Sequence, residues 1–73
     1  MILLVGKDCP RCEALEKEFP DVATLDARKT RDGMIAAAFH NVMALPALVI
    51  DDDTCIRDSE AIRGYLREHM LAG

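Results

Sequence analysis

The sequence predicts one α/β domain in which a mixed four-stranded sheet carries helices on both faces. Two observations support this prediction. Short aliphatic runs of strand length alternate with segments whose apolar residues recur at helical spacing. Glycine and proline separate these segments, and the last two apolar runs are close enough in sequence to form a hairpin. The expected order of elements is β-α-β-α-β-β-α, over residues 1–73 as a single domain.

The first half of the chain predicts a strand, a helix and a second strand. Residues 2–5 form a continuous aliphatic run, typical of a strand buried on both faces, and Gly6 ends it. Pro10 suits the first turn of a helix, and Pro20 closes that helix. Residues 22–26 alternate well enough for a short second strand. The apolar stripe of the helix consists of Cys12, Leu15 and Phe19.

The next segment predicts a second helix over residues 32–40. Thr30 or Asp32 could cap this helix, and Gly33 weakens its opening turn. The apolar stripe expected to face the core consists of Ile35, Ala38, Phe39 and Val42. The methionines expected to fill the core are Met34, Met43 and Met70.

The remaining residues predict a hairpin and a last helix. Residues 47–50 form a third buried strand, and residues 54–57 form its partner beyond a turn of aspartates. Asp58 or Ser59 caps the last helix, and residues 71–73 are expected to fray at its end. The stripe of this helix consists of Ile62, Tyr65, Leu66, His69 and Met70.

Length, charge and hydropathy exclude several classes of protein. Seventy-three residues, of which 51% are hydrophobic, are enough for one thin core. A formal net charge of −4, with no basic run, disfavours nucleic-acid binding. No stretch approaches the roughly 20 apolar residues of a membrane span, and the opening apolar run lacks the features of a signal peptide. We therefore expect a cytoplasmic protein without membrane contact.

The pair Cys9 and Cys12 is the strongest chemical signal in the sequence. Two cysteines at this spacing, between a strand and a helix, place the first sulfur beside the free amide groups of the helix. The partial positive charge there favours a thiolate, which is the attacking species in disulfide exchange. We therefore assign Cys9 as the nucleophile and Cys12 as the resolving thiol. Pro10 stiffens the turn, and Lys7 and Arg11 are nearby cations that could tune the thiolate.

A metal-binding module is the alternative use of the same pair. Cys9 and Cys12 could hold zinc, copper or a subunit-bridging iron–sulfur cluster, but structural zinc takes four ligands. The other sulfur and imidazole ligands are Cys55, His40 and His69, with no second close pair among them, so a metal centre would need a dimer or a partner. Redox chemistry without a metal is favoured, and Cys55 is expected to be a small core residue. A binding domain whose cysteines act only as a switch is a third interpretation.

The apolar first strand, the Cys9-Pro10-Arg11-Cys12 turn and Leu45-Pro46 ahead of the third strand together resemble the thioredoxin superfamily. The Cys-Pro-x-Cys form and the short chain are most similar to glutaredoxins and glutaredoxin-like redoxins. The resemblance implies a thioredoxin-like fold with a cis peptide bond before Pro46, which would lie against the cysteines. It also implies that the backbone of Leu45 pairs with an extended substrate. The substrate contacts it implies are Pro10, Arg11, Leu45 and Pro46.

The same resemblance implies an activity and its partners. The protein would reduce protein disulfides by cycling Cys9 and Cys12 between dithiol and disulfide, as a monomer with no bound cofactor. Its place would be in electron transport and cell redox homeostasis. The electron donor would be a flavin-dependent enzyme of the thioredoxin reductase type, or glutathione as co-substrate. Ser59 and Glu60, ahead of the last helix, are the residues offered for contact with glutathione or a partner.

Overall fold

The computed structural model describes residues 1–70 and shows an α/β fold built on a mixed four-stranded sheet. The strands are β1 (Ile2–Val5), β2 (Thr24–Asp26), β3 (Ala47–Asp51) and β4 (Thr54–Ile56). The helices are α1 (Pro10–Glu18), α2 (Arg31–Phe39) and α3 (Ser59–Met70). The element order is the predicted β-α-β-α-β-β-α. The fraying expected for residues 71–73 lies outside the described residues, and none of the described helices is long and apolar enough to cross a bilayer.

The strand order β2-β1-β3-β4 places β1 and β3 in the middle of the sheet. β1 pairs in parallel with β2 and antiparallel with β3, which forms an antiparallel hairpin with β4. Parallel neighbours need a crossover connection, and α1 provides it. Because β1 and β2 run in the same direction, the loops that follow them leave the sheet at the same edge. This edge carries the candidate functional site.

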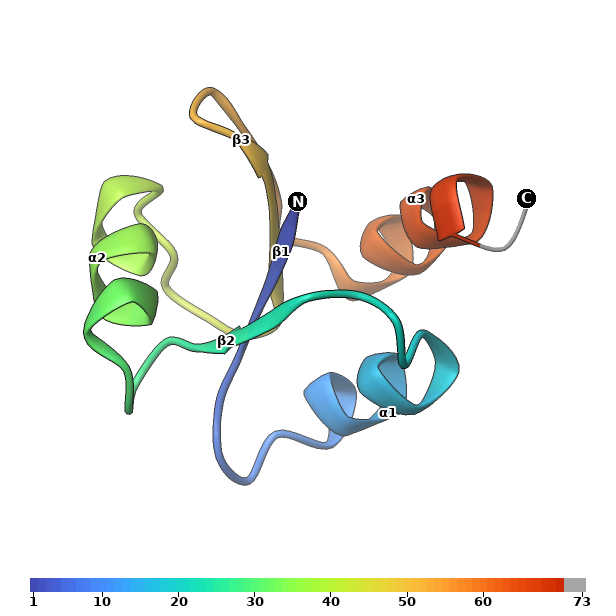
Figure 1. Cartoon of the computed structure of the whole chain (residues 1–73), viewed down its shortest axis with the longest axis horizontal. Coiled ribbons are helices and arrows are strands. Elements are labelled where there is room, and N and C mark those ends of the chain that lie inside the picture. Colours follow the sequence, from blue (N-terminus) through green and yellow to red (C-terminus); the bar gives the residue numbers. More distant parts are fainter. Residues whose placement is uncertain (71–73) are drawn as a thin grey trace.

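The two faces of the sheet carry different layers: α1 and α3 cover one face and α2 covers the other (Figure 1). The buried residues under α1 and α3 are Leu3, Val5, Cys12, Leu15, Phe19, Val22, Leu48, Ile62 and Leu66. The buried residues under α2 are Leu4, Ala27 and Ala47. Glu18 ties α1 to α3, because its carboxylate accepts hydrogen bonds from Nε of Arg63 at 3.0 Å and Nε of Arg67 at 3.1 Å. Helices on both faces of a mixed sheet confirm the predicted layers.

The apolar stripe predicted for α2 points in the wrong direction. Ile35 and Phe39, expected in the core, are 58% and 65% exposed. Of the predicted stripe, Val42 alone packs against the sheet. Ala38, Met34 and Met43, also expected in the core, are exposed as well.

Small residues of α2 face the sheet instead, because the first turn of the helix packs closely against the end of β2. Thr30 is the N-cap: its Oγ1 accepts a hydrogen bond from the Gly33 N–H at 3.0 Å and donates to the Asp26 carbonyl at 2.7 Å. A Cβ at Gly33 would collide with that same carbonyl. The close approach leaves room for glycine and alanine, so Ala36 and Ala37 pack against the sheet and larger residues turn outward.

The other elements lie close to their predicted positions. β2 begins at Thr24, two residues later than expected, because Val22 still belongs to the turn after α1, where its N–H donates to the Phe19 carbonyl at 3.2 Å. Asp58 provides the capping oxygen near the start of α3, accepting from the Ala61 N–H at 2.9 Å. His69, expected on the apolar stripe of α3, is exposed and stacks on the Tyr65 ring, with ring centroids 4.0 Å apart. Met70 packs against the core as predicted.

Candidate redox site

Cys9 occupies the N-cap position of α1, immediately before Pro10. Its sulfur accepts a hydrogen bond from the backbone N–H of Cys12, with a nitrogen–sulfur distance of 3.2 Å. Asp8 just before it has a φ of 56°, in the left-handed region, where the chain turns from β1 into the helix. The free amide groups and the dipole at this helix end stabilise negative charge on the sulfur. This is the environment that favours a thiolate.

Cys9 and Cys12 form a disulfide, with their Cα atoms 5.2 Å apart. The two sulfurs differ in access. Cys12 is 0% exposed and belongs to the core under α1 and α3, whereas Cys9 is partly exposed and lines a hollow on the surface. A molecule in solvent can therefore reach the sulfur of Cys9 but not that of Cys12.

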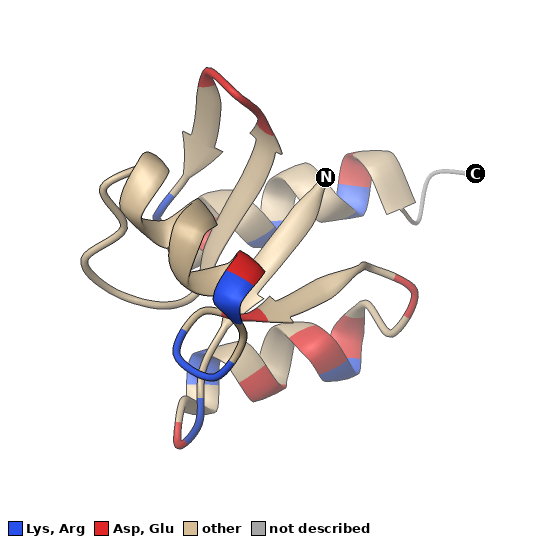
Figure 2. Ribbon diagram, turned by 60° about the vertical axis from the view of Figure 1, so that its left-hand side comes forward, with Lys and Arg blue, Asp and Glu red and all other residues tan. Residues whose placement is uncertain are grey.

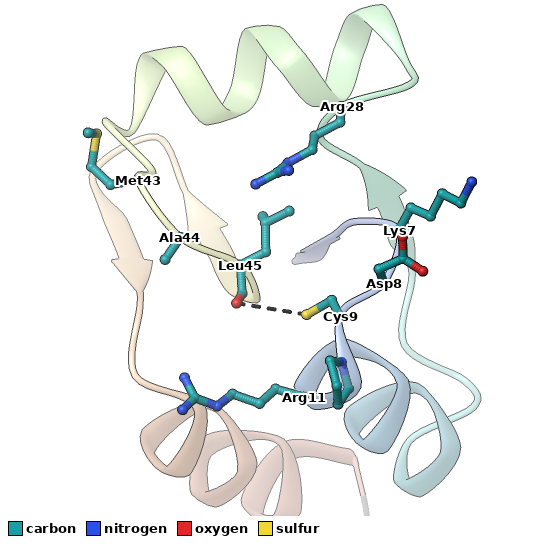
Figure 3. Close-up of a pocket in the computed structure, with 9 residues that line it drawn as sticks. Lys7, Asp8, Cys9, Arg11, Arg28, Met43, Ala44 and Leu45 are labelled. Atoms are coloured by element: carbon teal, nitrogen blue, oxygen red, sulfur yellow. Dashed lines mark hydrogen bonds between the residues drawn. The ribbon is translucent and has the colours of Figure 1, made fainter.

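The hollow beside Cys9 has a volume of about 440 Å³ (Figure 3). Its walls come from the loop after β1, the first turn of α1, the loop after β2 and the loop before β3. The lining residues are Lys7, Asp8, Cys9, Pro10, Arg11, Arg28, Met43, Ala44 and Leu45. The Cys9 sulfur faces the Leu45 carbonyl oxygen at 3.8 Å. A disulfide sulfur carries no hydrogen, so this is a contact in the oxidised chain, and only the reduced thiol can donate to that oxygen.

The loop before β3 contributes Met43, Ala44 and Leu45 to the lining of the hollow. Pairing of β3 with β1 starts at Ala47. Within residues 1–70, no protein group accepts a hydrogen bond from the backbone N–H of residues 43–45. The Leu45–Pro46 peptide bond is cis, as the resemblance implied, and Pro46 is buried behind Leu45. An extended peptide in the hollow would find hydrogen-bonding groups at Leu45, opposite Cys9.

Cations outnumber carboxylates around the hollow. Lys7, Arg11 and Arg28 line it, against Asp8 as the single acidic residue of the lining. Figure 2 shows Lys and Arg gathered where the loops after β1 and β2 meet, while α1 and the turn between β3 and β4 carry much of the acidic charge. The site is therefore locally cationic in a chain whose formal net charge is −4.

Arg28 is the lining residue with chemistry that the sequence analysis missed. It lies in the loop after β2, and the backbone N–H groups of Arg28 and Lys29 both donate to the Asp26 carboxylate at 2.8 Å. These hydrogen bonds lower the pKa of Asp26 and hold the loop in place. The predicted β-α-β order could have indicated Arg28, because parallel pairing of the first two strands places the loop after β2 beside the loop that carries Cys9.

The structure brings together most of the predicted site residues. Lys7, Cys9, Pro10, Arg11 and Leu45 line one hollow. Cys12 and Pro46 are buried and do not line it, but Cys12 is bonded to Cys9 and Pro46 follows Leu45. Ser59 and Glu60 begin α3 and do not line this hollow; the Glu60 carboxylate accepts from Nη1 of Arg63 at 2.8 Å.

The third cysteine is separate from the pair. Cys55 is half-buried and packs against the cluster under α2, whereas Cys12 lies in the cluster under α1 and α3. Among residues 1–70, no group of three or more His, Cys, Asp and Glu side chains is arranged to hold a metal ion.

Comparisons of this chain with models of protein families, with curated proteins and with solved structures find no match.

Proposed function

We propose that this chain is a thiol–disulfide oxidoreductase of the thioredoxin and glutaredoxin type, which reduces protein disulfides through Cys9 and Cys12. The placement of Cys9 carries this proposal: its sulfur caps α1, accepts the Cys12 N–H at 3.2 Å and borders an open hollow. The element order, the mixed sheet and Leu45–Pro46 opposite the cysteines support a thioredoxin-like fold.

In the first step, the thiolate of Cys9 attacks one sulfur of the substrate disulfide. A bond forms between this sulfur and Cys9 Sγ, the substrate S–S bond breaks, and the other substrate sulfur leaves as a thiolate that takes a proton from water. The amide groups at the start of α1 favour the attacking thiolate. Pairing of an extended substrate segment with the free backbone at Leu45 would hold its disulfide beside Cys9.

In the second step, Cys12 resolves the mixed disulfide. Its thiol loses a proton, and the thiolate attacks Cys9 Sγ, which displaces the second substrate sulfur as a thiolate. The chain ends with the Cys9–Cys12 disulfide, and two electrons have passed to the substrate. A flavin-dependent reductase or glutathione would return two electrons to the chain, with no cofactor bound to it. Because Cys12 is buried, its thiolate attacks the mixed disulfide at Cys9 and not disulfides in solution.

Redox titration tests this function. The protein is equilibrated in graded ratios of reduced and oxidised dithiothreitol, the remaining thiols are alkylated, and blocked cysteines are counted by mass. We expect the free thiols of Cys9 and Cys12 to disappear together, at a single midpoint of the redox series. The Cys55→Ser variant should show the same midpoint. A pair that stays reduced in metal-free protein, or oxidises only between chains, would contradict the proposal and favour the metal-binding module.

A trapping experiment tests the order of the two thiols. The reduced Cys12→Ser variant should accumulate a mixed disulfide with a substrate peptide at Cys9, because the resolving thiol is missing. The matched Cys9→Ser variant should form little adduct, since Cys12 is buried. Equal trapping by both variants, read as an added peptide mass, would show that the assignment of nucleophile and resolving thiol is wrong.

A further inference from the structure

The charge around Cys9 is opposite in sign to the charge of the chain. Three of the nine Lys and Arg residues line the hollow, but only one of the thirteen Asp and Glu residues does. Exposed charges act mainly over short distances at physiological salt, so a bound segment responds to this local excess and not to the net charge. The hollow therefore suits a negatively charged occupant.

Two of these cations lie on opposite sides of the reacting sulfur. Figure 3 shows the guanidinium group of Arg28 on one side of the line from Cys9 to Leu45, and that of Arg11 on the other. Arg28 comes from the loop after β2 and Arg11 from α1, so the two positions are set by separate elements. The side chains of Lys7 and Asp8 point to the outer side of the loop after β1.

From this arrangement we propose that the preferred substrate is a polypeptide segment with acidic residues on both sides of its disulfide-bonded cysteine. Arg28 binds the carboxylate on one side and Arg11 binds the carboxylate on the other, while the cysteine lies between them at Cys9. A guanidinium group presents several N–H donors that match the two oxygens of a carboxylate. This inference rests on the proposed exchange chemistry of Cys9 and Cys12 and adds the class of substrate.

A polypeptide fits the rest of the hollow better than a small disulfide. The wall opposite Cys9 offers unpaired backbone over residues 43–45, which suits an extended main chain. Met43 lies on the same wall and is 92% exposed, so a bound segment with an apolar residue would cover a side chain that now meets water. Charge on two sides, free backbone and an exposed methionine together describe a contact area several residues long.

Single-turnover kinetics with matched peptides test the preference. Pre-reduced protein is mixed with peptide disulfides of equal length in which the cysteine is flanked by Glu, Gln or Lys, and released thiol is followed. No electron donor is needed, because each reduced chain supplies two electrons once. Every rate is divided by the rate of dithiothreitol with the same peptide, which removes differences in the intrinsic reactivity of the disulfides.

We expect the Glu peptide to react about tenfold faster than the Gln peptide at low salt, if each exposed ion pair contributes about threefold. The Lys peptide should be slower than the Gln peptide. At about 1 M salt, where the screening length falls to about 3 Å, the differences should largely disappear.

Matched variants separate these contacts from general charge. Arg28→Gln should lower the Glu-to-Gln rate ratio about threefold, whereas Lys29→Gln, in the same loop but outside the lining of the hollow, should leave it unchanged. Arg11→Gln should lower the ratio similarly, with Lys17→Gln on the exposed side of α1 as its control. Use of the ratio corrects for any effect of Arg11 on the reactivity of the neighbouring thiols.

The possible results lead to different conclusions. Equal rates for the Glu and Lys peptides at low salt would overturn the acidic preference and leave the exchange function intact. Failure to reduce any of the peptides would contradict the exchange function and this inference with it. Oxidised glutathione is the small-molecule control. If it is reduced faster than the Glu peptide, and if Arg28→Gln lowers both rates by the same factor, the cations serve a small carboxylated disulfide. The polypeptide proposal would then be wrong.

Discussion

The layer under α1 and α3 and the layer under α2 differ in what fills the space between helix and sheet. On the first face, large side chains meet in a continuous core, among them Leu15, Phe19, Ile62 and Leu66. On the second face, Ala36 and Ala37 pack against a smaller buried cluster that includes Ala27, in the loop after β2, and Ala47 of β3. Each buried Å² of apolar surface contributes roughly 25 cal/mol, so the first layer provides most of the hydrophobic stabilisation.

The difference explains how the two walls of the candidate redox site are held. Cys12 lies within the large-residue core, and Glu18 further fixes α1 to α3 through two arginines. The loop with Arg28 belongs to the thinner layer, where hydrogen bonds to Asp26 and the close approach of Gly33 set its position. The two cysteine sulfurs therefore lie on the layer under α1 and α3, and the position of Arg28 on the opposite wall depends on hydrogen bonds to Asp26.

The largest expected effect is loss of a core side chain from the first layer. Leu66→Ala should lower the free energy of unfolding by about 2–5 kcal/mol, because Leu66 is fully buried and the change leaves a cavity. Ile35→Ala on the exposed side of α2 is the control, and its effect should stay within about 0.5 kcal/mol. Urea unfolding of the oxidised proteins measures both; equal losses would contradict the assignment of the two layers.

Gly33→Ala should break the close approach of α2 to the sheet. Its Cβ would collide with the Asp26 carbonyl, so α2 and the end of β2 would have to move apart, and we expect a loss of about 1–3 kcal/mol. A second readout is the Glu-to-Gln peptide rate ratio, which should fall because the loop with Arg28 shifts. An unchanged urea midpoint would show that the helix can move away from β2 without cost.

Gly64→Ala, in the layer of α1 and α3, should stabilise the protein, in contrast to Gly33→Ala. A Cβ at Gly64 meets no atom within 4 Å, and the residue lies inside α3. Alanine is favoured over glycine in a helix interior, so this variant should gain roughly 0.5–1 kcal/mol in urea unfolding. Destabilisation here would mean that α3 depends on flexibility at this position.

The smallest expected effect is the response of the Asp26 loop to acid. The hydrogen bonds from the Arg28 and Lys29 N–H groups lower the pKa of Asp26 below its usual value of 3.8. A carboxyl whose pKa is lowered by folding adds stability above its unfolded pKa, and that stability is lost as pH falls through the folded value. The urea midpoint should therefore decrease below about pH 4, and Asp26→Asn should make this decrease shallower.

Asp52→Asn is the control for that measurement. The Asp52 carboxylate accepts none of the side-chain hydrogen bonds found in the part of the chain that the structure describes. The Asp52→Asn variant should therefore show nearly the same slope of stability against pH, below pH 4, as the unchanged protein. A slope that responds equally to both substitutions would mean that general charge, and not the Asp26 hydrogen bonds, causes the acid sensitivity.

Local features of the sequence were sufficient for the element order and for the position of Cys9. The aliphatic run over residues 2–5, the proline after Cys9 and the capping residues before the helices each act within a few neighbours. For the same reason, the sulfur of Cys9 at the start of α1 was predicted correctly. For the second helix, the local pattern offered two candidate N-cap residues, Thr30 and Asp32, and did not decide between them.

Only the tertiary structure decided which side of α2 faces the sheet and which cation joins the site. Helical spacing identifies an apolar stripe, but Ile35 and Phe39 point outward because the contact between Gly33 and Asp26 admits only small side chains. Arg28 reaches the hollow because β2 lies parallel to β1. Both outcomes depend on the distance between segments far apart in the chain, and a periodic pattern in one segment carries no information about that distance.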